Sequence, residues 1–145
     1  MTTTRTRPEG LVRGHLDVIG VVAVGGALGA AGRYGLAQCR PIPIGEFPWA
    51  TLVTNLTGCF AIGVVMVFVE RVWSGRRLVR PFLGVGLLGG YTTFSTYAVD
   101  IGTLFARSRP VPAVLYLIGT PIGALLATTA AIVLTRWLLG PREKR

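Results

Sequence analysis

The stretch GLLGGYTTFSTY, residues 86–97, decides how this chain folds. It lies within a long uncharged run, 81–99, and joins the pair Gly89-Gly90 to a dense group of hydroxyl side chains. A glycine costs about 1 kcal/mol inside a helix, and a helix broken at membrane depth needs protein or a cavity around its freed backbone groups. We therefore predict that a helix over 81–105 is broken near its middle. The alternative is a glycine kink whose hydroxyls bond back to the preceding turn.

The composition around this stretch is that of a membrane protein. Hydrophobic residues make up 51% of the chain, charged residues make up 14%, and the mean hydropathy is +0.59. A bilayer core about 30 Å thick requires about 20 apolar residues in a helix. The first apolar run reaches that length only if Leu16 begins it and Arg33 lies inside its last turns. The fold class is all-α integral membrane, with four transmembrane helices predicted at about 16–38, 48–70, 81–105 and 111–139.

The basic residues predict the orientation of these helices. Four spans place both termini on one side, and the segments 1–15, 71–80 and 136–145 on that side hold 11 of the 15 basic residues. The positive-inside rule assigns this side to the cytoplasm, so we expect a multi-pass protein of the cell membrane (inner or plasma). Because the charges flank apolar spans, the net charge of +9 does not indicate nucleic acid as a partner. The expected parts are a disordered cytoplasmic tail at 1–14, a transmembrane domain at 15–140 and a basic cytoplasmic tail at 141–145.

The polar side chains within the spans are neutral donors. No Ser-His-Asp, Cys-His or metal-binding constellation occurs, so we do not expect an enzyme. Asp17, Glu46, Glu70 and Asp100 all lie near predicted span ends, whereas a proton-coupled exporter needs a buried carboxylate. Donors without negative charge suit an anion. The donors are Asn55, Thr92, Thr93, Ser95, Thr96, Thr120 and the tyrosine phenols.

Two interpretations fit several of these residues. The amide of Asn55 serves either as a hydrogen bond between helices or as part of a polar pathway. Phe94 and Tyr97 share one helix face, where they either pack in a core or turn their positive ring edges toward an anion. Small residues spaced as GxxxG let helices approach closely. Three such pairs, with too few helices to enclose a pathway, indicate an oligomer: Gly25/Gly29, Gly86/Gly90 and Gly119/Gly123.

Three segments together resemble the Fluc/CrcB family of fluoride channels across the whole transmembrane length. They are GGALGAAGRYGL at 25–36, FPWATLVTNLTGCFAIG at 47–63 and GLLGGYTTFSTYAVD at 86–100. The resemblance implies a passive, fluoride-selective channel that exports F⁻ and lowers cytoplasmic fluoride. It also implies a dual-topology dimer, in which two antiparallel subunits form two fluoride pathways along their interface.

The resemblance also implies roles for particular residues. Asn55 lines a pathway, and Phe94 and Tyr97 form an aromatic box whose ring edges face fluoride. A polar track continues this pathway through Ser95, Thr96, Tyr116 and Thr120. Backbone carbonyls of Gly89 and Thr92, released by a break at 89–92, hold one structural Na⁺ at the dimer interface. Arg33 belongs to an anion-attracting vestibule or makes a structural pair, unless it is only a snorkelling charge at a helix end.

Two features depart from the simplest member of such a family. Tyr97 stands where the usual pattern has a second Phe, and its added donor and bulk predict that one of the two pathways is altered or inactive. The bias of 11 basic residues to 4 opposes insertion in both orientations. We therefore favour a heterodimer with a homologous partner over self-association. The alternatives are a small proton-coupled multidrug exporter and a non-conducting partner subunit of a heterodimeric channel.

Overall fold

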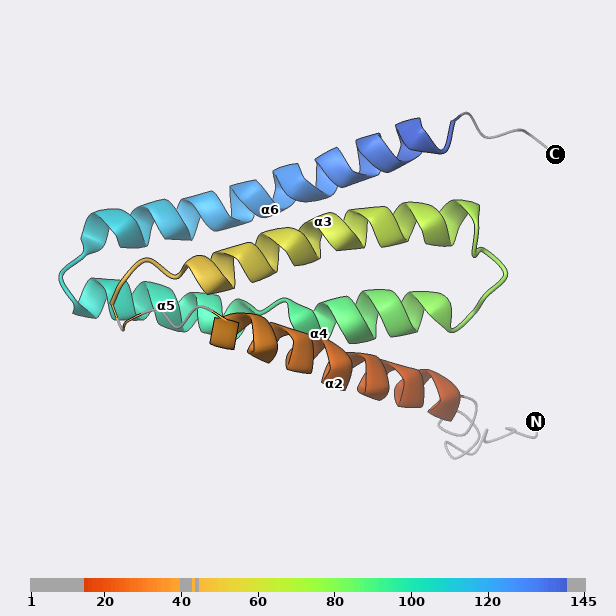
Figure 1. Cartoon of the computed structure of the whole chain (residues 1–145), viewed down its shortest axis with the longest axis horizontal. Coiled ribbons are helices and arrows are strands. Elements are labelled where there is room, and N and C mark those ends of the chain that lie inside the picture. The colour runs from red at the N-terminus through yellow and green to blue at the C-terminus, as the bar shows by residue number, and fades with distance from the viewer. Residues whose placement is uncertain (1–14, 40–42, 44, 141–145) are drawn as a thin grey trace, which may run out of the picture.

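A computed structural model describes residues 15–39, 43 and 45–140, and every regular element in these residues is helical (Figure 1). The predicted tails at 1–14 and 141–145 lie outside the described residues. The π-helix η1 precedes the short helix α4 directly. The elements are α2 (Leu16–Cys39), α3 (Trp49–Arg71), η1 (Pro81–Leu88), α4 (Gly89–Tyr91), α5 (Phe94–Ala106) and α6 (Pro110–Leu138).

Three of the helices begin and end within one residue of the predicted bounds. These helices, α2, α3 and α6, are each long and apolar enough to cross a membrane. Arg33 lies inside α2, as the short first apolar run required. Pro110 opens α6, a position that proline favours because its missing N–H has no partner there anyway. The remaining span, predicted at 81–105, is divided among η1, α4 and α5.

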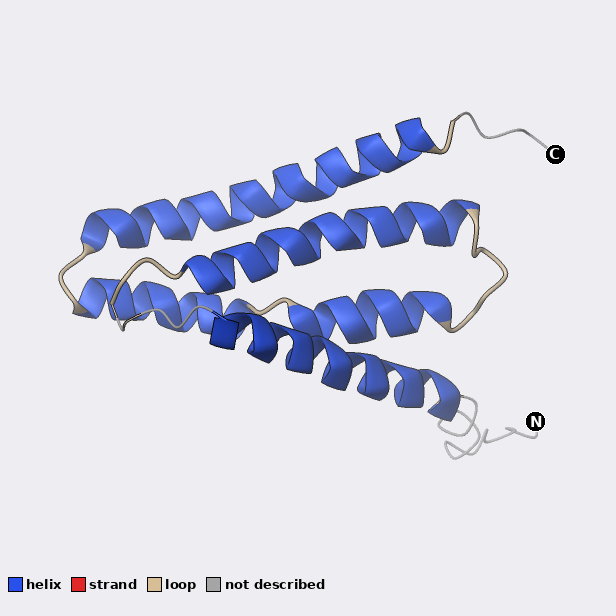
Figure 2. Ribbon diagram, in the orientation of Figure 1, coloured by secondary structure: helices blue, strands red, loops and turns tan. Residues whose placement is uncertain are grey.

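The helices pack side by side, with α3 along α6 and α2 along η1 and α4 (Figure 2). The first turn of α2, the segment 72–80 and the last turn of α6 lie at the same end of the bundle (Figure 1). Two contacts at this end tie the chain together: Arg77 pairs with Asp17 of α2, and Arg71 Nη1, at the end of α3, donates to the carbonyl of Gly140, just after α6, over 2.6 Å. The bundle therefore gathers the arginines of 71–77 beside the helix ends.

Glycines bring α2 into backbone contact with η1 and α4. A Cβ atom on Gly25 would lie 2.6 Å from the Phe82 carbonyl oxygen, and one on Gly86 would lie 2.9 Å from that of Val22. Gly29 and Gly90 are equally enclosed by the opposite backbone. Two of the three GxxxG pairs thus face each other. The third does not: around Gly119 there is open space.

The helical run from η1 to α5 is interrupted at two threonines rather than at the glycines. Thr92 has ψ 158° and Thr93 has φ −148° and ψ 126°, both extended, whereas Gly89 is helical with φ −66° and ψ −34°. Helix α5 then begins with Thr93 as its N-cap, since Thr93 Oγ1 accepts from the Thr96 N–H over 3.2 Å. The break expected at 89–92 therefore falls at 92–93: Gly89 and Gly90 continue the helical segment, and Gly90 serves the packing against Gly26 of α2.

Candidate functional site

The side chain of Asn55, from α3, holds the interruption in place. Asn55 Oδ1 accepts from the Thr93 N–H over 2.9 Å, and Asn55 Nδ2 donates to the Thr93 carbonyl over 3.0 Å. One amide therefore satisfies both backbone groups of the extended residue, which would otherwise be unpaired in an apolar setting. Gly58, one turn further along α3, leaves room for the Thr92 methyl group and the Tyr91 ring. Helix α3 is thus shaped to fit the break.

Two backbone carbonyls lose their usual donors at the break. In a continuous helix the Thr93 N–H would bond to the Gly89 carbonyl, and the Thr96 N–H would bond to the Thr92 carbonyl. Here these two N–H groups donate to Asn55 Oδ1 and to Thr93 Oγ1 instead. The carbonyl oxygens of Gly89 and Thr92 are therefore released from the helical hydrogen-bond pattern.

A cavity of about 270 Å³ lies beside the break, between α3, α5 and α6. None of the residues that line it is charged. Thr120 is 6% exposed, and its buried Oγ1 has no hydrogen-bond partner among the described residues. Phe94, in contrast, is 79% exposed. The lining residues are Asn55, Cys59, Thr92, Thr93, Phe94, Tyr97, Thr120, Pro121 and Ala124.

The phenol of Tyr97 is bound to the backbone of α6. Its hydroxyl donates to the Leu117 carbonyl over 2.6 Å, and the side chain is buried. The ring lies between those of Phe94 and Tyr116, with centroids 5.6 Å and 5.2 Å away. Tyr116 is fully buried behind it and does not line the cavity. Tyr97 therefore joins the cavity wall to a buried aromatic cluster.

The predicted site residues do not all converge. Asn55, Phe94, Tyr97 and Thr120 line the 270 Å³ cavity, as does Thr92. Ser95 is exposed, with Oγ 3.2 Å from Thr93 Oγ1, and Thr96 Oγ1 accepts from that same hydroxyl. The remaining predicted site residues, Ser95, Thr96, Tyr116, Gly89 and Arg33, are absent from the lining of this cavity.

Arg33 contacts the segment just before the break. Its Nε donates to the Gly90 carbonyl over 3.3 Å. With Thr96 and Thr93 it lines a separate cavity of about 70 Å³. Of the roles considered for Arg33, this contact is the one expected of a structural pair.

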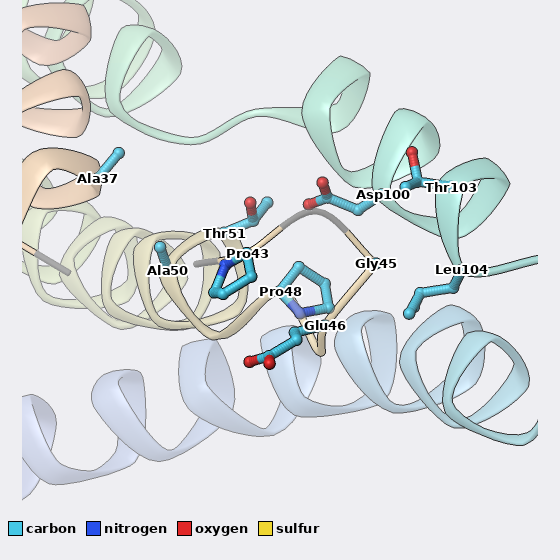
Figure 3. A pocket seen from close by; sticks show the side chains of 10 residues that line it. All are labelled: Ala37, Pro43, Gly45, Glu46, Pro48, Ala50, Thr51, Asp100, Thr103 and Leu104. Atoms are coloured by element: carbon cyan, nitrogen blue, oxygen red, sulfur yellow. The ribbon is translucent and has the colours of Figure 1, made fainter. Parts of the chain in front are cut away.

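A third cavity, of about 300 Å³, opens at the start of α3, and Asp100 from α5 points toward Thr51 within it (Figure 3). The sequence placed Asp100 near a span end and gave it no role. Its Oδ2 is nevertheless buried, without a partner in full hydrogen-bond geometry among the described residues. The hydroxyls of Thr51 and Tyr116 are its polar neighbours. The signal that could have found it is that Asp100 is the only charged residue in the run 81–106.

Three further residues line the 270 Å³ cavity: Thr93, which the sequence offered only as one of several neutral donors, and Cys59 and Pro121, to which it assigned no site role. Thr93 carries a signal, since a hydroxyl residue directly before an apolar helical segment is typical of an N-cap. Cys59 follows Asn55 by four residues and so shares its helix face.

Apolar helices of membrane-spanning length, around an uncharged polar cavity at a helix interruption, define a multi-pass membrane protein. The sequence identifies the family within this class: the chain belongs to the CrcB family. The family is described as "CrcB-like protein, Camphor Resistance (CrcB)", and its pattern matches residues 20–132. "Fluoride-specific ion channel FluC 2" of Nocardia farcinica is 48% identical over 85% of this chain and 88% of its own length. "Fluoride-specific ion channel FluC 1" of Streptomyces coelicolor is 46% identical over 99% of both chains. "Fluoride-specific ion channel FluC 2" of Streptomyces avermitilis is 50% identical over 74% of this chain and 68% of its own.

Proposed function

We propose that this chain forms a passive, fluoride-selective channel that exports F⁻ and lowers cytoplasmic fluoride. The observation that carries the proposal is the uncharged cavity beside the break, in a chain whose relatives are named fluoride-specific ion channels. No carboxylate lines this cavity to repel an anion or to carry a coupled proton. The proton-coupled multidrug exporter therefore gains no support.

The cavity offers the donors that a small anion needs. One N–H of the Asn55 amide is held by the Thr93 carbonyl, and the amide has a second N–H. The hydroxyl of Thr120 is buried and has no protein partner among the described residues. Ring edges of Phe94 and Tyr97 add weak positive charge at the cavity wall. Neutral donors of this kind attract fluoride without holding it as a fixed positive charge would.

A second, antiparallel subunit completes the pathways in this proposal. Phe94 is largely exposed although it lines the cavity, so a partner that covers Phe94 would also close the cavity wall. Each subunit would then contribute one aromatic pair to the interface. Ser95 and Thr96 would extend the polar track through their bonds to the Thr93 hydroxyl, and Tyr116 would support the Tyr97 ring from behind.

The partner that we favour is a homologous chain of opposite charge bias. The 11 basic residues on the side of the termini favour one orientation, with both termini in the cytoplasm. The names FluC 1, FluC 2 and FluC 3 among the relatives indicate that some organisms carry more than one such chain. In such a pair this chain would either conduct or act as the partner of a conducting subunit.

The carbonyls of Gly89 and Thr92 are suited to a structural Na⁺ between the subunits. Their usual helical donors bond elsewhere, so both oxygens are available, and hard cations prefer such oxygen ligands. When bound, Na⁺ would supply a positive charge that holds the two broken helices together. Arg33 would support the same region. Its bond to the Gly90 carbonyl ties Gly90, which lies between Gly89 and Thr92 in the sequence, to α2.

Fluoride efflux from liposomes that contain the purified chain tests the proposed function. A fluoride electrode follows the efflux, and chloride efflux from matched liposomes is the control. We expect fast efflux of fluoride and no comparable efflux of chloride. If this chain alone gives no fluoride efflux and a co-reconstituted homologue restores it, the function belongs to a heterodimer. If there is no efflux even with such a partner, the proposal is contradicted.

A further inference from the structure

Pro121 removes a hydrogen bond from the interior of α6, next to the cavity. Proline has no N–H, and in a helix the N–H of residue 121 would bond to the carbonyl of Leu117. The Leu117 carbonyl has therefore lost its helical donor. The Tyr97 hydroxyl donates to this same carbonyl over 2.6 Å, although Tyr97 comes from α5. A side chain from one helix thus replaces the backbone donor that is missing from another.

This replacement takes place beside the cavity: Tyr97 and Pro121 both line it, and the Leu117 carbonyl lies behind the lining, against the Tyr97 hydroxyl. A carbonyl oxygen carries partial negative charge, and without a donor it would attract water or repel an anion beside it. We propose that Tyr97 is a positioning residue, whose hydroxyl masks the Leu117 carbonyl exposed by Pro121. The masking keeps a free acceptor away from the fluoride pathway and ties α5 to α6. The part that concerns fluoride rests on the proposed function.

The proposal reverses the expectation attached to Tyr97. A phenol in place of the usual Phe predicted an altered pathway, because an additional donor would face the ion. Here the donor is already occupied by the backbone, so the hydroxyl compensates for a feature of this chain's own last helix. Tyr97→Phe should therefore impair the channel, although it brings the residue closer to the family pattern.

The substitution isolates the hydrogen bond from the packing. The Tyr97 ring contacts those of Phe94 and Tyr116, and Tyr97→Phe leaves these ring contacts in place. Pro121→Ala restores an N–H that can bond to the Leu117 carbonyl, so the tyrosine hydroxyl is no longer required. Tyr34→Phe is the matched control, because the Tyr34 hydroxyl is exposed and, within the described residues, accepts a hydrogen bond from Gln38 Nε2 of its own helix.

The test is a double-mutant cycle on the full chain, with Tyr97→Phe, Pro121→Ala and the double variant. The current through individual channels in a planar bilayer is measured with fluoride as the permeant anion. This current does not depend on how many molecules fold. We expect Tyr97→Phe to lower it about tenfold, since a buried acceptor is left unpaired. In the Pro121→Ala background the same change should alter it less than about twofold, and Tyr34→Phe should not alter it.

Thermal unfolding of the same variants in detergent gives a second readout that does not involve fluoride. Tyr97→Phe should lower the apparent midpoint by about 3 to 8 °C in the parent chain, and much less beside Pro121→Ala. Equal losses in both backgrounds, or no loss in either, would overturn the proposal. Pro121→Val replaces Pro121→Ala if that variant does not fold. If the parent chain gives no fluoride current alone, the cycle is measured with a homologous partner; no current with that partner either would contradict the proposed function, while the unfolding cycle would still decide whether the hydroxyl replaces the missing donor.

Discussion

At the scale of single residues, Asn55 has the largest expected effect, because both backbone groups of Thr93 depend on its amide. Asn55→Asp keeps the acceptor but loses the donor and adds negative charge to the cavity wall. We expect fluoride efflux to fall about tenfold or more, since the added carboxylate and a fluoride ion a few ångströms away repel each other strongly in the low-dielectric surroundings of a protein. Asn55→Leu would leave two buried groups unpaired, at about 1–3 kcal/mol each, and should reduce the folded yield as well. Efflux from Asn55→Asp equal to that of the parent chain would exclude Asn55 from the pathway.

Thr120 separates a role in conduction from a role in folding. Its buried hydroxyl has no partner in the described residues, so it contributes no hydrogen bond to stability. Thr120→Val, which removes the hydroxyl at nearly constant volume, should lower fluoride efflux severalfold without lowering the apparent unfolding midpoint. Thr128→Val is the opposite control, because Thr128 Oγ1 bonds to the carbonyls of Cys59 and Ala124. It should cost stability, about 1 kcal/mol for such a bond, and leave efflux unchanged. A reversed pattern would contradict the assignment.

At the scale of helices, the sequence predicted bounds well and local geometry less well. Long apolar runs with prolines at their starts gave α3 and α6 almost to the residue, because length and hydropathy determine such spans. The break was expected at 89–92, partly because glycine weakens helices, yet Gly90 lies against the backbone of Gly26 in α2 and the helical turn continues through both glycines. The position of the break depends instead on an N-cap and on an amide from α3, which are tertiary interactions. For the same reason the bond between Tyr97 and Leu117 could not be read from the chain.

The contact between α2 and η1 makes a prediction at this scale. Gly25→Ala would place a methyl group 2.6 Å from the Phe82 carbonyl oxygen, so the two backbones must separate. Overpacking of this kind costs about 1–3 kcal/mol, and the apparent unfolding midpoint should fall by several degrees. Gly20→Ala is the matched control in the same helix, since no atom lies within 4 Å of its added methyl group. Equal midpoints for the two variants would show that the close approach of these helices is not required.

At the scale of the whole molecule, the arrangement of charges bears on assembly. The described segments 71–80 and 136–140 meet at one end of the bundle (Figure 1), where Arg77 pairs with Asp17 and Arg136 lies 3.6 Å from Glu70. Neither pair neutralises the excess, because the chain carries 15 basic and 6 acidic residues. The resulting bias should fix one orientation in the membrane. A subunit fixed in one orientation needs an oppositely oriented partner to build an antiparallel dimer.

Labelling of the two ends of the chain tests this argument. A cysteine is added at each terminus of a variant in which Cys39 and Cys59 are replaced by serine, and intact cells are treated with a membrane-impermeant maleimide. We expect no labelling until the cells are opened, because the proposed orientation places both termini inside. The double substitution Arg76→Ala and Arg80→Ala weakens the excess of basic residues on the side of the termini but leaves the pair between Arg77 and Asp17 in place. A fraction of these chains should then be labelled from outside. Labelling of about half of the parent chains would instead show that the protein inserts in both orientations. Two copies could then form an antiparallel homodimer, and this chain alone should give fluoride efflux.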